Sequence, residues 1–146
     1  AYWQTRGYGT TSWPSCGEID IMEHWGSRPN FVQSAMHTKS SSGDTVNKGW
    51  QTIATATTDF HIYTMDWSAE SIVFSVDNKV HYRYHPRIKN SRTWPFDKEQ
   101  YLILNLAIAS DIDSSFNGAK MEIDYIRVYT PDAGSGVEPV WSDEFE

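Results

Sequence analysis

The sequence predicts an all-β fold, and three observations support that prediction. Helix signals are poor along the 146 residues, short segments of alternating or β-branched residues recur, and Gly, Ser, Asn and Pro lie between them. Aromatic residues make up 14% of the chain and apolar residues 39%, which is too apolar for a disordered protein. Short strands joined by such turns predict one antiparallel sandwich or barrel.

The individual strands follow from alternation and β-branched content. We expect strands at 18–23, 60–67, 71–76, 79–84, 101–107 and 121–129. Asp77-Asn78 separates two of them and fits the two-residue turn of a hairpin, with an I′-type backbone. The small, polar residues of 39–44 and 109–118 predict two surface loops.

Composition excludes several classes of protein. Twelve Lys and Arg against nineteen Asp and Glu give a net charge of -7, which does not suit nucleic acid as a partner and argues mildly against sulfated polysaccharides. No run of 18 apolar residues is present, so we expect no membrane span, and no signal peptide is visible. The single cysteine, Cys16, rules out an internal disulfide framework and a cysteine-based zinc site.

Three carboxylates lie close together in the segment 17–26. On a regular strand Glu18 and Asp20 share one face, whereas Glu23 points with the isoleucines into the core. A buried, unpaired carboxylate is costly, and a β-bulge removes the cost. If Ile21 and Met22 together occupy one step of the strand, Glu23 returns to the face of Glu18 and Asp20.

Carboxylates arranged in this way suit glycoside hydrolysis. Like charges raise at least one pKa, so one group can hold a proton while another stays ionised. Glu18 and Glu23 have Cα atoms roughly 13 Å apart on a flat strand, so spacing alone leaves retaining and inverting mechanisms open. The same cluster also fits a Ca²⁺ site or a charged sheet edge that prevents aggregation.

The segment around these carboxylates resembles a known family. Residues 13–26, WPSCGEIDIMEHWG, closely resemble the active-site strand of glycoside hydrolase family 16, in its laminarinase (endo-1,3-β-glucanase) branch. The family pattern is E-x-D-x-x-E, with the extra residue before the last Glu forming the bulge. Further stretches resemble the family in the same order, at 36–38, 59–67, 94–107 and 124–129. The resemblance covers residues 1–130.

The resemblance implies a fold and a reaction. The fold would be a concanavalin-like β-jelly-roll sandwich with a cleft on its concave face. The protein would be a secreted, retaining endo-glycoside hydrolase that cleaves β-1,3-glucan without a catalytic cofactor. Glu18 would be the nucleophile, Glu23 the general acid and then the general base, and Asp20 would hydrogen-bond to the nucleophile.

Aromatic and histidine side chains supply candidate substrate contacts. Sugar rings stack on exposed aromatic planes, and Trp3, Trp13 and Trp25 flank the carboxylates in sequence. Core packing is the alternative for each of them, and Trp25 shares the parity of Glu23. By family analogy His37 would contact the catalytic region, although a structural role fits it equally well.

Metal binding is expected at one position only. Structural Ca²⁺ in the family uses a carboxylate of the closing strand, and Asp124 is the matching position, with an ordinary exposed strand residue as the alternative. His81 and His85 have the spacing of metal ligands on a helix, but they lie on a predicted strand, so we do not expect them to bind metal.

The end of the chain departs from the family order. Residues 140–146 resemble the beginning of a family 16 domain, yet they follow its closing strand. We therefore expect a permuted or split domain, with the catalytic strand in a C-terminal portion at 1–132, a linker at 133–136 and the start of the same domain at 137–146. A complementary chain or another copy would complete the sandwich, and this chain alone would expose sheet edges.

Two other functions remain open at this stage. One is a non-catalytic β-glucan-binding sandwich, which would need the aromatics but not the Glu18 and Glu23 pair. The other is a hydrolase of mixed-linkage glucan or of a galactan. Residues 107–111 lack the glycine-rich, Trp-containing stretch of many laminarinases, which leaves the exact β-glucan preference open. A substrate panel separates these functions.

Overall fold

A computed structural model describes residues 2–7, 11–108, 110, 112–130 and 138–145, with only the backbone described for 2–7. The chain divides into two compact units, Ala1–Ala107 and Ile108–Glu146. The described residues contain strands, turns and loops but no helix, as the sequence predicted. A membrane-spanning helix is accordingly not found among these residues.

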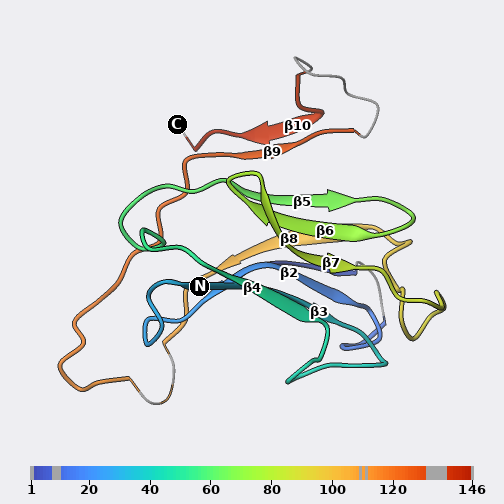
Figure 1. Cartoon of the computed structure of the whole chain (residues 1–146), viewed down its shortest axis with the longest axis horizontal. Coiled ribbons are helices and arrows are strands. Elements are labelled where there is room, and N and C mark those ends of the chain that lie inside the picture. Colours follow the sequence, from blue (N-terminus) through green and yellow to red (C-terminus); the bar gives the residue numbers. More distant parts are fainter. Residues whose placement is uncertain (1, 8–10, 109, 111, 131–137, 146) are drawn as a thin grey trace. The chain divides into compact units, whose positions relative to one another are not determined.

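The first unit contains two antiparallel sheets (Figure 1). The larger has five strands in the order β4-β3-β2-β1-β8, and the smaller has three in the order β5-β6-β7. The bounds are β1 Tyr2–Gly7, β2 Glu18–His24, β3 Phe31–His37, β4 Lys48–Thr52, β5 Tyr63–Trp67, β6 Ile72–Val76, β7 Lys79–Tyr84 and β8 Gln100–Asn105.

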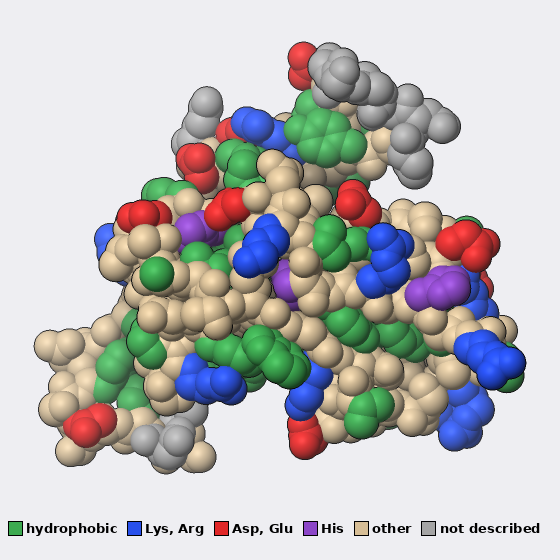
Figure 2. All heavy atoms as spheres, viewed as in Figure 1, with side chains coloured by type: hydrophobic (Ala, Val, Ile, Leu, Met, Phe, Trp, Pro, Cys, Tyr) green, Lys and Arg blue, Asp and Glu red, His purple; other side chains and the backbone are tan. Residues whose placement is uncertain are grey.

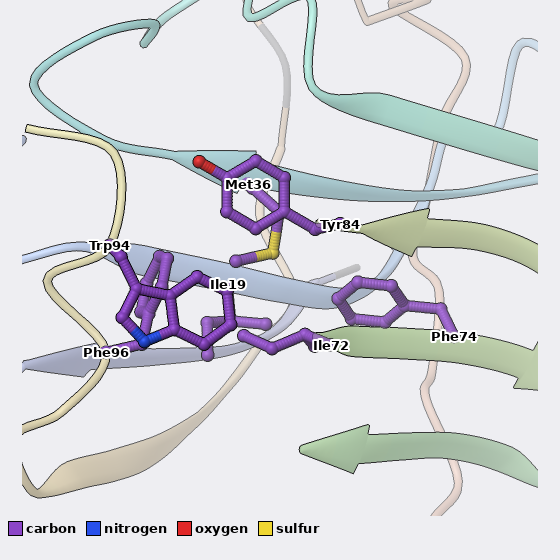
Figure 3. Close-up of a cluster of buried hydrophobic side chains, with 7 residues drawn as sticks. All are labelled: Ile19, Met36, Ile72, Phe74, Tyr84, Trp94 and Phe96. Atoms are coloured by element: carbon purple, nitrogen blue, oxygen red, sulfur yellow. The ribbon is translucent and has the colours of Figure 1, made fainter. Parts of the chain in front are cut away.

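The hydrophobic core lies between these two sheets. Ile19 and Met36 of the large sheet meet Ile72 and Phe74 of the small sheet, as Figure 3 shows. The same cluster is completed by Tyr84, Trp94 and Phe96, which pack as an aromatic trio. A second cluster of the same layer contains Met22, Val32, Ile53 and Val76. The predicted sandwich is therefore confirmed.

A close approach fixes the entry into β2. Gly17 has a φ of +80°, and a Cβ atom there would lie 2.7 Å from both Phe96 Cε1 and Pro95 Cγ. Only glycine fits both the backbone conformation and the space. The loop before Glu18 is thereby held against the aromatic core.

The β6–β7 hairpin has the predicted turn. Asp77 and Asn78 have φ angles of 50° and 65°, as an I′ turn requires. The predicted strand 60–67 begins only at Tyr63, and Ile62 before it bonds to both the backbone N–H and the side chain of Asp77. Asp77 accepts a hydrogen bond from the Ile62 N–H at 2.9 Å and lies 2.6 Å from His61 Nδ1.

The second unit has one small sheet. The predicted strand 121–129 is reduced to β9, Ile126–Val128, which pairs antiparallel with β10, Trp141–Asp143. Arg127 and Glu144 form a bidentate ion pair across this ribbon. Arg127 Nε lies 2.9 Å from Glu144 Oε1, and Nη2 lies 2.7 Å from Oε2. Residues 133–136, the predicted linker, lie outside the described residues, and the proposed permutation stays a prediction.

Candidate active site

A bulge in β2 brings the three carboxylates to one face. Asp20 pairs with Ala35 and Glu23 with Gln33, so two residues of β2 oppose one residue of β3. The register between β1 and β2 shifts at the same place. Ile21 and Met22 consequently both contact the core, and Glu23 rejoins the face of Glu18 and Asp20, as the sequence predicted.

Glu18 lies buried at the start of β2, opposite His37 in the sheet register. Its Oε2 atom accepts a hydrogen bond from the indole Nε1 of Trp13. Trp13 itself stays exposed, and its ring lies 6.1 Å from the His37 ring. An exposed tryptophan that binds a buried carboxylate orients that carboxylate and offers a flat apolar surface beside it.

Asp20 is 2% exposed and lies between the two glutamates. Burial raises its pKa to about 6, and the negative charges of Glu23 and Glu18 add to the rise. His37 Nε2 lies 2.9 Å from Asp20 Oδ2 and opposes the rise. Burial lowers the pKa of His37, but its contact with Asp20 and the surrounding carboxylates outweigh this effect and raise the pKa.

Glu23 occupies a different environment at the far side of the bulge. It is buried, and its Oε2 accepts a hydrogen bond of 2.9 Å from Gln33 Nε2. Burial is the main cause that raises the pKa of Glu23, and the charge of Glu18 adds to it. The Gln33 hydrogen bond and the positive charges of His37 and Lys48 act in the opposite direction without cancelling the rise.

A cavity of about 400 Å³ opens beside Glu23. Its lining includes Trp25, Arg28, Gln33 and Lys48, so polar groups surround one half-buried aromatic ring. Such a mixture suits a sugar, which offers hydroxyl groups at its rim and apolar C–H groups on its faces. The cavity therefore lies where a substrate next to Glu23 would be held.

An aromatic row continues from the cavity across the sheet. The rings of Trp25 and Phe31 are 6.3 Å apart, and those of Phe31 and Trp50 are 6.2 Å apart. The Arg28 guanidinium covers the Phe31 ring at 3.5 Å, while Trp50 is 60% exposed. Trp50 is therefore the exposed end of this row, whereas Trp94 is buried in the core.

Most of the residues singled out from sequence meet at this face. Trp13 contacts both Glu18 and His37, and His37 contacts Asp20. Glu23 and Trp25 join this group through the cavity, which both line together with His37. Trp3 lies on β1, opposite Met22 in the register, but its side chain is outside the described residues.

Several residues of the site were not predicted from sequence. Gln33 contacts Glu23 directly, and Lys48 forms an ion pair of 2.5 Å with Asp44 at the cavity. Gln33 has the same parity as His37, so an alternating strand at 31–37 would have placed both on one face. Small and polar residues interrupt the β-branched pattern of that segment, so the pattern alone did not predict the strand.

The expected metal position lies in the second unit. Asp124 is exposed, and among the residues that the structure describes no three His, Cys, Asp or Glu side chains gather into a metal site. A site made of one carboxylate and backbone carbonyl groups would not form such a cluster, so calcium at Asp124 stays a prediction, and no step of the chemistry below depends on a metal.

Charged side chains of both signs are interspersed on the face shown in Figure 2. Lysine and arginine side chains lie there among acidic ones and form no broad basic stripe. A nucleic-acid partner would favour such a stripe.

The fold and the site together define an all-β sandwich protein with three carboxylates on one bulged strand. The sequence model of the family described as glycosyl hydrolases family 16 matches residues 1–127. The chain therefore belongs to glycosyl hydrolase family 16.

Individual relatives agree with this assignment. The chain is 38% identical over 135 residues to a β-glucanase of Rhodothermus marinus, covering 84% of this chain and 47% of that protein. It is 38% identical over 126 residues to a keratan-sulfate endo-1,4-β-galactosidase of Sphingobacterium multivorum, covering 80% of this chain and 29% of that protein.

A solved structure also resembles the fold. The laminarinase from Flavobacterium sp. UMI-01 matches with a TM-score of 0.67 and 37% identity, over 69% of this chain and 45% of that one. This chain thus spans about half the length of the β-glucanase and of the laminarinase that it resembles.

Proposed function

We propose that the protein is a retaining endo-glycoside hydrolase that cleaves β-1,3-glucan. The observation that carries the proposal is the bulge, which brings Glu18 and Glu23 to one face and gives them different partners, an indole N–H and an amide. A pair of carboxyl groups in unequal environments is what acid-assisted glycoside cleavage requires.

In the proposed reaction Glu18 attacks the anomeric carbon while Glu23 protonates the departing glycosidic oxygen. The raised pKa of Glu23 lets it hold that proton at a pH where an ordinary glutamate is ionised. Water, activated by the ionised Glu23, then displaces Glu18 and releases the sugar. Asp20 and His37 orient Glu18 and shape the charge around it.

The assignment of β-1,3-glucan rests on relatives. The names of the laminarinase and of a glucan endo-1,3-β-glucosidase A1 from Niallia circulans, 36% identical over 141 residues, specify that class of activity. Because long polysaccharide chains do not diffuse across a membrane, we also propose that the protein acts outside the cell.

A galactan is the second candidate substrate. The observation that favours it is the keratan-sulfate endo-1,4-β-galactosidase, which has the same 38% identity to this chain as the β-glucanase, over a slightly shorter stretch. Two cationic side chains at the cavity, Arg28 and Lys48, give an anionic sugar a place to bind. The exposed carboxylate of Asp44, which pairs with Lys48, counts against this reading.

A substrate panel tests the proposal. Laminarin, mixed-linkage glucan, agarose and carrageenan are incubated with the protein and with Glu18→Gln, which keeps the shape of the side chain but removes its charge. We expect new reducing ends with laminarin for the wild type and a loss of at least about 1,000-fold for Glu18→Gln.

Glu122→Gln, at an exposed carboxylate in the second unit, is the matched control and should retain full activity. Cleavage of agarose or carrageenan in preference to laminarin would replace the β-1,3-glucan assignment with the galactan one. Laminarin hydrolysis that is unaffected in Glu18→Gln would contradict the catalytic role of this strand.

A further inference from the structure

Two polar side chains, Ser34 and His81, join the two sheets directly beneath the bulge of β2. Ser34 of β3 is 0% exposed, and its Oγ donates a hydrogen bond of 2.7 Å to the carbonyl oxygen of Ile21. The same Oγ lies 2.9 Å from Nε2 of His81 on β7, the outer strand of the facing sheet. Hydroxyl and imidazole groups are otherwise unusual in an apolar layer, so their presence requires a reason.

The bulge supplies that reason for Ser34. Ile21 has no register partner on either neighbouring strand, because the pairing passes from Asp20 to Met22 on one side and from Asp20 to Glu23 on the other. A buried carbonyl group without a partner costs about 1–3 kcal/mol. Ser34 lies opposite this irregularity and satisfies the carbonyl from the core side.

A second irregularity brings His81 to the same point. Phe74 pairs with Tyr82 and Ser75 with Val80, so His81 has no register partner on β6. Gly49, which pairs with Ser34, has no side chain where a Cβ atom would lie 2.7 Å from Tyr82 Cβ and 2.8 Å from the His81 carbonyl oxygen. The missing side chain lets β7 approach closely enough for the imidazole to reach Ser34.

The hydrogen-bond directions determine the form of the imidazole. Ser34 has one hydroxyl proton and gives it to the Ile21 carbonyl, so His81 Nε2 must be the donor to Ser34 Oγ. His81 Nδ1 has no hydrogen-bond partner among the described residues. Burial lowers the pKa of His81, which agrees with a neutral ring that carries its proton on Nε2.

We propose that Ser34 and His81 are positioning residues for Glu23. His81 orients the Ser34 hydroxyl, Ser34 holds the Ile21 carbonyl, and the bulge held in this way keeps Glu23 on the face of Glu18 and Asp20. This inference rests on the proposed function, in which Glu23 is the acid and base of the reaction.

Four variants test the inference. Ser34→Ala removes the hydroxyl, His81→Leu removes the donor, and His81→Gln places an amide N–H where Nε2 lies. Ser71→Ala is the matched control, because this serine is also buried but lies just before β6 of the other sheet, where its Oγ accepts a hydrogen bond from Arg83.

We expect kcat on laminarin to fall about 100-fold in Ser34→Ala and in His81→Leu, with KM little changed, because catalysis is sensitive to displacements of about 1 Å. His81→Gln and Ser71→Ala should keep kcat within a few-fold of the wild type. Thermal unfolding of each variant shows that the lost activity is not lost folding. Equal kcat values in His81→Gln and His81→Leu would overturn the inference.

A second readout does not depend on activity. The carboxyl carbon resonance of Glu23 is followed by NMR as a function of pH in the wild type and the four variants. We expect its titration midpoint to move in Ser34→Ala and His81→Leu and to stay in place in His81→Gln and Ser71→Ala. An unmoved midpoint in all four contradicts the inference even if no polysaccharide is cleaved, whereas a moved midpoint without any cleavage contradicts only the proposed function.

Discussion

Asp20 lowers the stability of the fold because its carboxyl group is buried in the site. Its carboxyl group is almost fully buried between two other carboxylates, and its pKa is raised from 3.8 to about 6. Between these two pH values the folded protein binds more protons than the unfolded chain. The contribution of Asp20 to the free energy of unfolding therefore falls as pH rises through this range, by on the order of 3 kcal/mol.

Asp20→Asn removes this titration. We expect the free energy of unfolding of the variant to decline less than that of the wild type between pH 4 and pH 7, as measured by urea unfolding at each pH. Asp44→Asn, at an exposed aspartate whose ion pair with Lys48 lowers its pKa, should keep the decline of the wild type. Parallel curves for Asp20→Asn and the wild type would contradict the account of the Asp20 environment.

Strands were predictable where one face is apolar and the turns are distinctive. The 71–84 hairpin shows both signals, and its turn has the positive φ angles that Asp77-Asn78 predicted. The bulge of β2 was predictable for a different reason: a regular strand would have buried Glu23 without a partner.

Other elements gave no such signal. The strand β3 alternates Phe31, Gln33, Ala35 and His37 on the site face with Ser34 on the core face, so neither face is uniformly apolar or polar. Gln33 binds the Glu23 carboxylate, and Ser34 binds the Ile21 carbonyl group at the bulge, which explains why both residues are polar. Those partners come from another strand, and the sequence of β3 alone does not reveal them.

At the scale of the whole molecule, the large sheet has an outer strand that can pair with another chain. β8 is the outer strand beside β1, and its neighbouring residues Tyr101 and Leu102 are 45% and 39% exposed, although they point to opposite faces. An edge strand with apolar side chains on both faces is a site for pairing with another chain. The expectation that a complementary chain or a second copy completes the sandwich stays a prediction.

We expect the apparent mass in light scattering to rise with protein concentration. Tyr101→Lys together with Leu102→Lys should lower the association, because charges on an edge strand oppose pairing. Val46→Lys, at an exposed apolar residue in a loop, serves as the control and should leave association unchanged. A wild-type protein that stays monomeric at every concentration would contradict the expectation.

The central claim is that Glu18 and Glu23 divide the roles of nucleophile and acid/base across the β2 bulge. The most direct test is azide rescue of Glu18→Ala and Glu23→Ala. The substrate is a β-glycoside of laminaribiose with an activated leaving group, and NMR determines the anomeric configuration of the product. A retaining mechanism with these roles predicts an α-glycosyl azide from Glu18→Ala and a β-glycosyl azide from Glu23→Ala. The reverse assignment, or rescue of neither variant, would contradict it.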